Sequence, residues 1–159
     1  MMAPQPLGIE GVAVDVEAAA ADKLRGMGIE PADLGTSFVT LDEIEAIQVK
    51  RDVGSILEWQ HINGLRVVRM ENVTSDGSGG GSDFRGICIS LSRARDSARS
   101  AATCALPVLD GIPIDNERLG YLDPESVAAM AVLQPIDARI LYGKRGDDGA
   151  VLIWTKGRR

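Results

Sequence analysis

The sequence predicts an α+β fold in which short helices pack on a small mixed β-sheet. The prediction rests first on apolar runs of strand character near Leu65, Gly86, Leu106, Met130 and Val151. It rests second on helix-start signals between several of these runs, where an Asp or a Thr precedes good helix formers. Helices between strands supply the crossover connections that parallel strand pairs need.

Length and charge set the broad class of the protein. A chain of 159 residues fits a single domain with a useful core, and no internal repeat is visible. The net charge of −6 disfavours a nucleic-acid partner, because phosphate binding depends on clustered Lys and Arg. No segment is apolar for long enough to cross a bilayer as a helix. Residues 1–6 lack a basic region followed by an apolar core, so no signal peptide is expected in the sequence as written.

The first 37 residues are expected to form an N-terminal unit of a strand, a helix and a linker. Residues 8–14 have strand character, and the alanine-rich run from Val14 to Arg25 predicts a helix that Gly26 and Gly28 end. The remainder, residues 38–159, is expected to form the main domain.

The main domain begins with two short helices. Phe38-Val39 predicts a short strand, and the Thr40 to Glu43 capping box starts a helix through Ala46. Asp52 is expected to cap a second helix, from Val53 to His61, which Gly64 ends. His61 is the only histidine and has no second metal ligand at a recognisable spacing, so its position near a helix C-terminus is read as structural.

The middle of the chain contains a glycine-rich loop and both cysteines. Residues 74–83 lack the Gly-Lys-Ser/Thr ending and the helix of a phosphate-binding loop, so they are read as a loop between strands. Cys88 and Cys104 bracket a polar segment, and three interpretations stay open. They could form a disulfide in an oxidising compartment, remain two buried thiols, or supply a nucleophile, although no base lies nearby in the sequence.

The last third of the chain carries the strongest local signals. Leu106 to Leu109, Asp110-Gly111 and Ile112 to Ile114 predict a hairpin whose second strand is an edge segment, because Pro113 cannot donate to a ladder. Asp123 and Pro124 are expected to start a helix that passes through residues 127–130 into a buried strand at 131–133. A helix over residues 136–142 then precedes Gly143, a loop at 144–149 and a strand at 150–154.

The order of these motifs resembles the plug domain of TonB-dependent outer-membrane receptors. The matching segments are Ile56 to Val67, Arg85-Gly86-Ile87, Leu106 to Ile114, Pro124 to Leu133, Tyr142 to Gly146 and Gly149 to Lys156. The residues carried over from the family are Asp110, Gly111, Tyr142, Gly143, Arg145 and Gly149. Their implied role is structural, and Arg145 is the one that could instead pair with a carboxylate of a barrel. A cysteine just before the Val-Leu-Asp-Gly strand is familiar in such chains, which favours the Cys88–Cys104 disulfide.

The resemblance implies a non-enzymatic plug that fills a barrel, contributes to ligand capture and is rearranged by the TonB system. The expected location is the outer membrane or the periplasm, with an outer-membrane β-barrel and the TonB system as partners and an unknown ligand. A barrel of about 22 strands does not fit in 159 residues. The alternative is therefore a stand-alone plug-like envelope interaction module with no transport activity of its own. No catalytic residue, cofactor or metal site is predicted.

Overall fold

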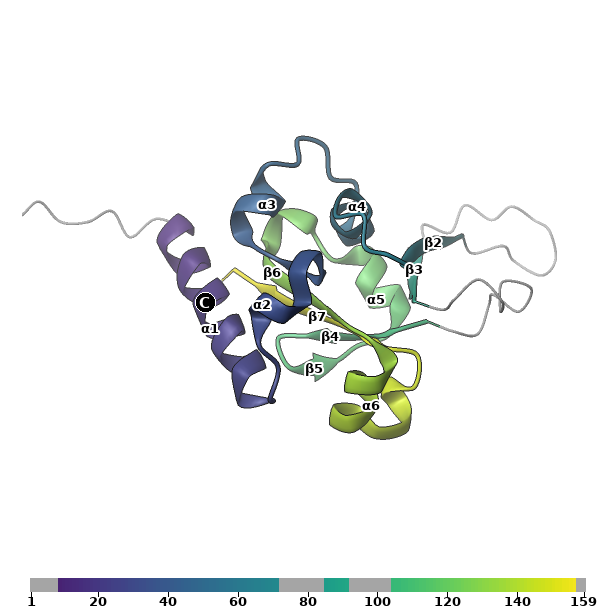
Figure 1. Ribbon diagram of the computed structural model, residues 1–159. Helices are drawn as coiled ribbons and strands as arrows, with labels where there is room; N and C mark the ends of the chain where they lie inside the picture. The colour runs from purple at the N-terminus through teal and green to yellow at the C-terminus, as the bar shows by residue number, and fades with distance from the viewer. Residues whose placement is uncertain (1–8, 72–84, 92–103, 157–159) are drawn as a thin grey trace, which may run out of the picture.

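The computed structural model describes residues 9–71, 85–91 and 104–156, and it confirms the α+β class (Figure 1). The helices are α1 (Ile9–Gly26), α2 (Pro31–Leu34), α3 (Leu41–Glu45), α4 (Val53–Trp59), α5 (Asn116–Tyr121) and α6 (Pro135–Tyr142). The strands are β1 (Phe38–Val39), β2 (Arg66–Glu71), β3 (Arg85–Ser90), β4 (Leu106–Leu109), β5 (Ile112–Pro113), β6 (Val127–Leu133) and β7 (Ala150–Thr155). Single 3₁₀ turns lie at Gly35–Ser37, Pro124–Ser126 and Gly143–Gly146.

The main sheet has five strands in the order β1-β6-β7-β4-β5. β4 runs parallel to β7, with Leu106 opposite Ala150, and the other three neighbouring pairs are antiparallel. The sheet is therefore mixed. Its longest strand is β6, which lies beside the central strand β7.

Alternate residues of the central strands enter two separate cores. Met130 and Val132 of β6 point into the larger core, whereas Ala131 and Leu133 point into the smaller one. The larger core also contains apolar side chains of α3, α4, α5 and β3, and the smaller core contains side chains of α1, α2 and α6. The sheet is thus covered on both faces, as Figure 1 shows.

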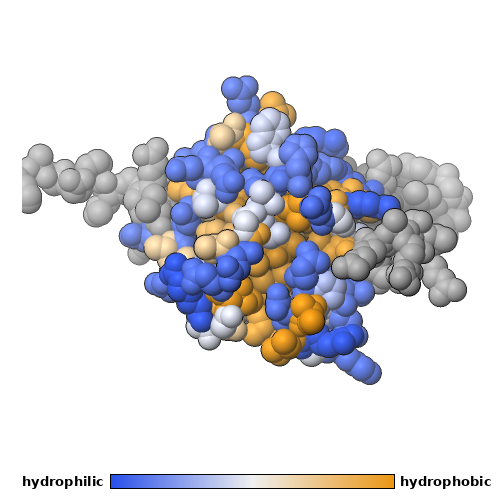
Figure 2. Space-filling view, viewed as in Figure 1, coloured by the Kyte–Doolittle hydropathy of each residue, from blue (hydrophilic) through white to orange (hydrophobic). Residues whose placement is uncertain are grey.

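Polar residues cover much of the face shown in Figure 2, and apolar residues are prominent at its lower edge, where α6 lies. The exposed apolar residues of α6 are Ile136 and Ile140, which are 73% and 78% exposed and lie one helical turn apart. An apolar surface therefore directly precedes the exposed basic pair Lys144 and Arg145.

Several local predictions are confirmed at atomic detail. Thr40 and Glu43 form the full capping box of α3, and the Asp52 side chain accepts from the Ser55 backbone N–H at the start of α4. The predicted helix end at His61 is wrong, because α4 ends at Trp59 with Gln60 as its C-cap. His61 itself takes a left-handed φ of 53°, which a helix cannot continue.

The predicted strand at residues 8–14 is also wrong, because α1 already begins at Ile9. A strand needs a neighbouring strand for its backbone hydrogen bonds, whereas a helix satisfies its own. Residues next to the alanine-rich run therefore extend that helix. Leu24 of α1 packs with Val108 and Leu133 of the main sheet. The division of the chain at residue 37 stays a prediction.

The predicted helix from Asp123 through residue 130 shortens to one 3₁₀ turn at Pro124–Ser126. β6 begins directly afterwards at Val127, and all seven of its residues are buried. A short apolar run does not distinguish a buried strand from a buried helix by its periodicity. The pairing of β6 with both β1 and β7 decides for the strand.

The five predicted strands do not share one sheet. The strands near Leu65 and Gly86 are β2 and β3, which form a separate antiparallel pair. A backbone hydrogen bond connects the two sheets. In it, the Ile89 carbonyl of β3 accepts from the Ala105 N–H just before β4. The glycine-rich loop predicted at 74–83 lies outside the described residues.

Candidate functional site

The hairpin turn between β4 and β5 is built on two residues with positive φ. Asp110 has φ 48° and Gly111 has φ 87°, which is the pattern of a tight turn that matches strand twist. The Asp110 backbone N–H donates to the Ile153 carbonyl, extending the contact between β4 and β7. The turn is therefore fixed to the central strand as well as to its own hairpin.

The side chain of Asp110 makes a second connection to β7. One carboxylate oxygen accepts from the Thr155 backbone N–H at 2.9 Å, and the other accepts from the Thr155 hydroxyl at 2.6 Å. Both oxygens are thus engaged at the end of β7.

A groove of about 720 Å³ opens beside this end of the sheet. Its lining residues are Leu109, Asp110, Arg118, Tyr121, Leu122, Asp123, Glu125, Ser126, Thr155 and Lys156. The three acidic side chains that line it are all engaged. Asp110 binds Thr155, Asp123 accepts from the Glu125 backbone N–H at 2.9 Å, and Glu125 pairs with Lys50 at 3.5 Å. The groove could therefore bind a polar ligand or a protein surface mainly through its cationic side chains.

The other predicted site residues lie at the opposite end of β7. Gly143 ends α6 with φ 64°, and Gly149 precedes β7 with φ 97°. The Gly149 carbonyl accepts from the Leu106 backbone N–H, which opens the parallel ladder between β4 and β7. A Cβ at Gly149 would overlap Leu91 and lie 2.9 Å from the Leu133 carbonyl, so only glycine fits.

Tyr142, Arg145 and Asp148 belong to the same turn. Tyr142 packs against the smaller core, and burial raises the pKa of its hydroxyl. Burial, followed by the charge of the neighbouring Asp147, raises the pKa of Asp148. Arg145 is exposed, and no described residue pairs with it.

The structure therefore separates the six predicted site residues into two groups. Asp110 and Gly111 lie where β7 ends, whereas Tyr142, Gly143, Arg145 and Gly149 lie where it begins. Within the described ranges, no three His, Cys, Asp or Glu side chains are grouped so that they could hold a metal ion. In the same part of the chain, no helix is long and apolar enough to cross a membrane.

Comparison with known proteins relates the chain to a TonB-dependent receptor by sequence and to a solved transporter structure by fold. No family model matches the chain. It is 28% identical over 99 residues to the TonB-dependent receptor SusC of Bacteroides thetaiotaomicron, a match that covers 57% of this chain and 9% of SusC. The structure of the RagAB peptide transporter shares the fold, with a TM-score of 0.51 and 19% identity over 75% of this chain and 12% of that chain. The chain carries a TonB-dependent receptor plug-like region.

The plug-like region spans only a small part of these relatives, 9% of SusC and 12% of the matched RagAB chain. The RagAB peptide importer in its closed-closed state gives a TM-score of 0.49 at 18% identity, again over 75% of this chain and 12% of that chain.

Sequence reasoning placed Gly146 in the Tyr142 to Gly146 motif but did not predict its contact with α6. Gly146 is buried against α6, and a Cβ there would overlap the backbone carbonyl of Ala138. This close approach holds the turn at Gly143–Gly146 against α6. The available signal was a small residue on each side of the contact, Ala138 in the helix and Gly146 in the turn.

The plug-like region also contains a charged cluster that joins α4 to β2. Arg69 donates to both oxygens of Asp52, at 2.9 and 3.0 Å, and to both oxygens of Glu58. Burial raises the pKa of Asp52, but the hydrogen bonds and charge of Arg69 outweigh burial and hold it below its ordinary value. The hydrogen bond from Arg69 to Asp52, followed by that to Glu58, raises the pKa of Arg69.

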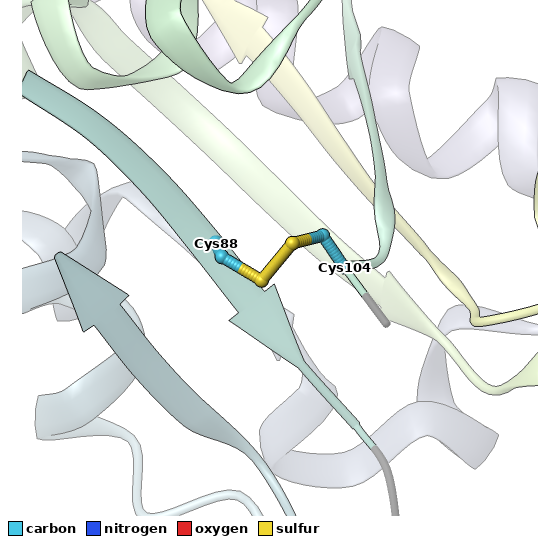
Figure 3. Close-up of a disulfide and its surroundings, with 2 residues drawn as sticks. All are labelled: Cys88 and Cys104. Atoms are coloured by element: carbon cyan, nitrogen blue, oxygen red, sulfur yellow. A yellow bond between two sulfur atoms is a disulfide. The ribbon is translucent and has the colours of Figure 1, made fainter. Parts of the chain in front are cut away.

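The two cysteines of the plug-like region are joined in the structure. Cys88 on β3 and Cys104, just before β4, form a disulfide with a Cα–Cα distance of 5.1 Å (Figure 3). Of the three interpretations that the sequence leaves open, the structure contains the disulfide, which links the second sheet to the start of β4.

Proposed function

We propose that this chain acts as a non-enzymatic plug in gated uptake across an outer membrane, and that it contributes to ligand capture. The observation that carries the proposal is the similarity to SusC, a TonB-dependent receptor. The fold likeness to the RagAB peptide transporter supports the same class of activity and makes peptides one candidate cargo. The proposed location is the outer membrane or its periplasmic face.

The described surface supports contact with an outer-membrane barrel. Ile136 and Ile140 form an apolar pair on α6, and the exposed Lys144 and Arg145 follow it. In this proposal the apolar pair packs against the barrel wall and Arg145 pairs with a barrel carboxylate, which would be a charge-assisted contact. Energy from the TonB system would rearrange the plug.

The absence of catalysis is also part of the proposal. The acidic groups of the Asp110 groove already serve as hydrogen-bond acceptors or ion-pair partners. The Asp110 carboxylate accepts from both the hydroxyl and the backbone N–H of Thr155, which fits a contact between strand ends rather than an activated nucleophile. Its exposed cation Arg118 and the partly exposed Lys156 are available to bind an anionic group.

The test is growth of the native host on a panel of large and small nutrients after deletion of this coding region. Uptake predicts that growth fails on at least one large nutrient, while growth on its small building blocks is unchanged. Unchanged growth on every nutrient would contradict uptake and favour the stand-alone interaction module.

A charge reversal tests the barrel contact separately. Arg145→Glu should reproduce the growth defect with the parent melting temperature, because no described residue pairs with Arg145. The neighbouring Lys144→Glu is the matched control and should grow normally. Equal growth of both variants would exclude the proposed Arg145 contact.

A further inference from the structure

Among the described residues, strand β2 is paired along one edge and open along the other. It pairs with β3 from Arg66, opposite Ser90, to Glu71, opposite Arg85. No other described strand pairs with β2. An unpaired edge presents a row of backbone N–H and C=O groups that another extended chain can complete.

The register shows which residues supply these open groups. The Ile89 carbonyl of β3 is directed to the Ala105 backbone N–H at 2.7 Å, which is the side of β3 away from β2. Ile89 is opposite Val67, so this pair is of the non-hydrogen-bonded kind in the antiparallel ladder. By the two-residue alternation, the backbone groups of Val67 and Arg69 face the open edge, and those of Arg66 and Val68 face β3.

A groove of about 790 Å³ borders the same residues. It is lined by Leu57 and Glu58 of α4 and by the continuous segment from His61 to Arg69. The groove therefore lies between the C-terminal part of α4 and β2, beside backbone groups that pair with no described strand. It is large enough to receive the side chains that an added strand would direct toward α4.

The charges of the groove favour an acidic occupant. Arg69 is already held by Asp52 and Glu58. Arg66 is exposed and, within the described ranges, has no partner. His61 is exposed on the same groove. Arg66 is therefore the uncompensated cation, although the whole chain carries a net charge of −6.

The geometry points to β2 as an acceptor strand for an extended segment of a partner polypeptide that carries a carboxylate opposite Arg66. Backbone pairing with Val67 and Arg69 supplies the affinity, and the carboxylate sets the register. This inference goes beyond the proposed function and does not depend on it, because it concerns a strand edge rather than barrel contact or uptake.

The first experiment uses a fluorescein-labelled peptide, acetyl-Thr-Val-Glu-Ile-Thr-Val-amide, and measures its anisotropy against the whole protein. Two control peptides carry backbone N-methyl groups on alternate residues, one on the odd-numbered and the other on the even-numbered residues. Strand addition predicts at least about tenfold weaker binding for one of the two control peptides, because two ladder hydrogen bonds are lost. Equal affinity of all three peptides, or no binding of the parent peptide, would overturn the inference.

Amide exchange measured by NMR supplies a second, independent readout. In the free protein the amides of Val67 and Arg69 should exchange faster than those of Arg66 and Val68, which face β3. The parent peptide should slow the exchange of Val67 and Arg69. Slow exchange of both amides in the free protein would mean that the edge is already occupied, and the inference would fail.

Charge reversal tests the role assigned to Arg66. Arg66→Glu should weaken the Glu-containing peptide and strengthen a peptide in which Lys replaces Glu. Arg51→Glu, a reversal of an exposed arginine outside the groove, should leave both affinities at the parent values. Parent affinities in Arg66→Glu would remove Arg66 from the recognition site and contradict the acidic occupant.

Discussion

Asp110 binds both the backbone and the hydroxyl of Thr155, a residue 45 positions later in the chain. The contact joins the β4–β5 hairpin turn to the last residue of β7. Because β4 and β7 are parallel neighbours, this contact adds to the backbone ladder between two strands that the chain connects through β5, α5, β6 and α6. The sheet end beside the candidate groove is therefore held by the Asp110 side chain as well as by the backbone hydrogen bond from Asp110 to Ile153.

Removing the Thr155 hydroxyl should weaken this connection. Thr155→Val keeps the side-chain shape and the backbone bond but loses the 2.6 Å hydrogen bond to Asp110, which should lower the free energy of unfolding by about 1 kcal/mol. Urea unfolding measures the change. Thr36→Val, at an exposed threonine without a hydrogen bond to any described side chain, is the control. Equal losses in the two variants would show that the Asp110 contact adds no stability.

Gly146→Ala should destabilise the protein because the added methyl would overlap the Ala138 carbonyl. Overpacking of this kind costs about 1 to 3 kcal/mol, measured by thermal or urea unfolding. Gly26→Ala is the matched control, since nothing lies within 4 Å of a Cβ at that position and its φ is not positive. If Gly146→Ala unfolds like Gly26→Ala, the close approach of the turn to α6 is not present in solution.

The Arg69 cluster should make stability depend on pH. The pKa of Asp52 is lowered in the folded state, so the stability it contributes is present above its ordinary pKa of 3.8 and is lost as the pH falls through the lower folded value. Arg69→Met should therefore cost about 1 to 3 kcal/mol at pH 7 and progressively less below about pH 4.

Urea unfolding of the parent and of Arg69→Met at pH 7, 5 and 3 checks this dependence. A difference that stays constant from pH 7 to pH 3 would exclude Asp52 ionisation as its source.

Loss of the disulfide should lower stability through the unfolded chain. Cys88 and Cys104 are 16 positions apart, and closing a loop of this size stabilises the folded state by about 3 kcal/mol in the chain-entropy estimate. The Cys88→Ala, Cys104→Ala double variant should therefore melt at a lower temperature than the oxidised parent. Addition of a reductant should lower the melting temperature of the parent and leave the variant unchanged. A parent insensitive to reductant would contradict a disulfide in the isolated protein.

Local chemistry made part of this fold predictable. The capping box at Thr40, the Asp52 cap and the Asp110-Gly111 turn each depend on residues within a few positions of one another, and all three occur where the sequence places them. The strand at Ala150–Thr155 follows from its β-branched and aromatic residues in the same way.

Features that depend on distant partners were not predictable. The sequence does not show that β2 and β3 leave the main sheet, because strand character does not specify a partner. The fit of Gly146 on Ala138 and the bonds from Arg69 to Asp52 likewise require the folded arrangement. The order of the six site residues in the sequence does not show that they lie at the two ends of β7.

The most direct test of the central claim is an immunoblot of fractionated native cells with an antibody against this plug-like region. The account predicts a signal in the outer-membrane fraction, either in a larger polypeptide or co-purifying with a barrel. A signal confined to the soluble fraction, at the mass of this chain alone and with no barrel attached, would contradict the uptake role.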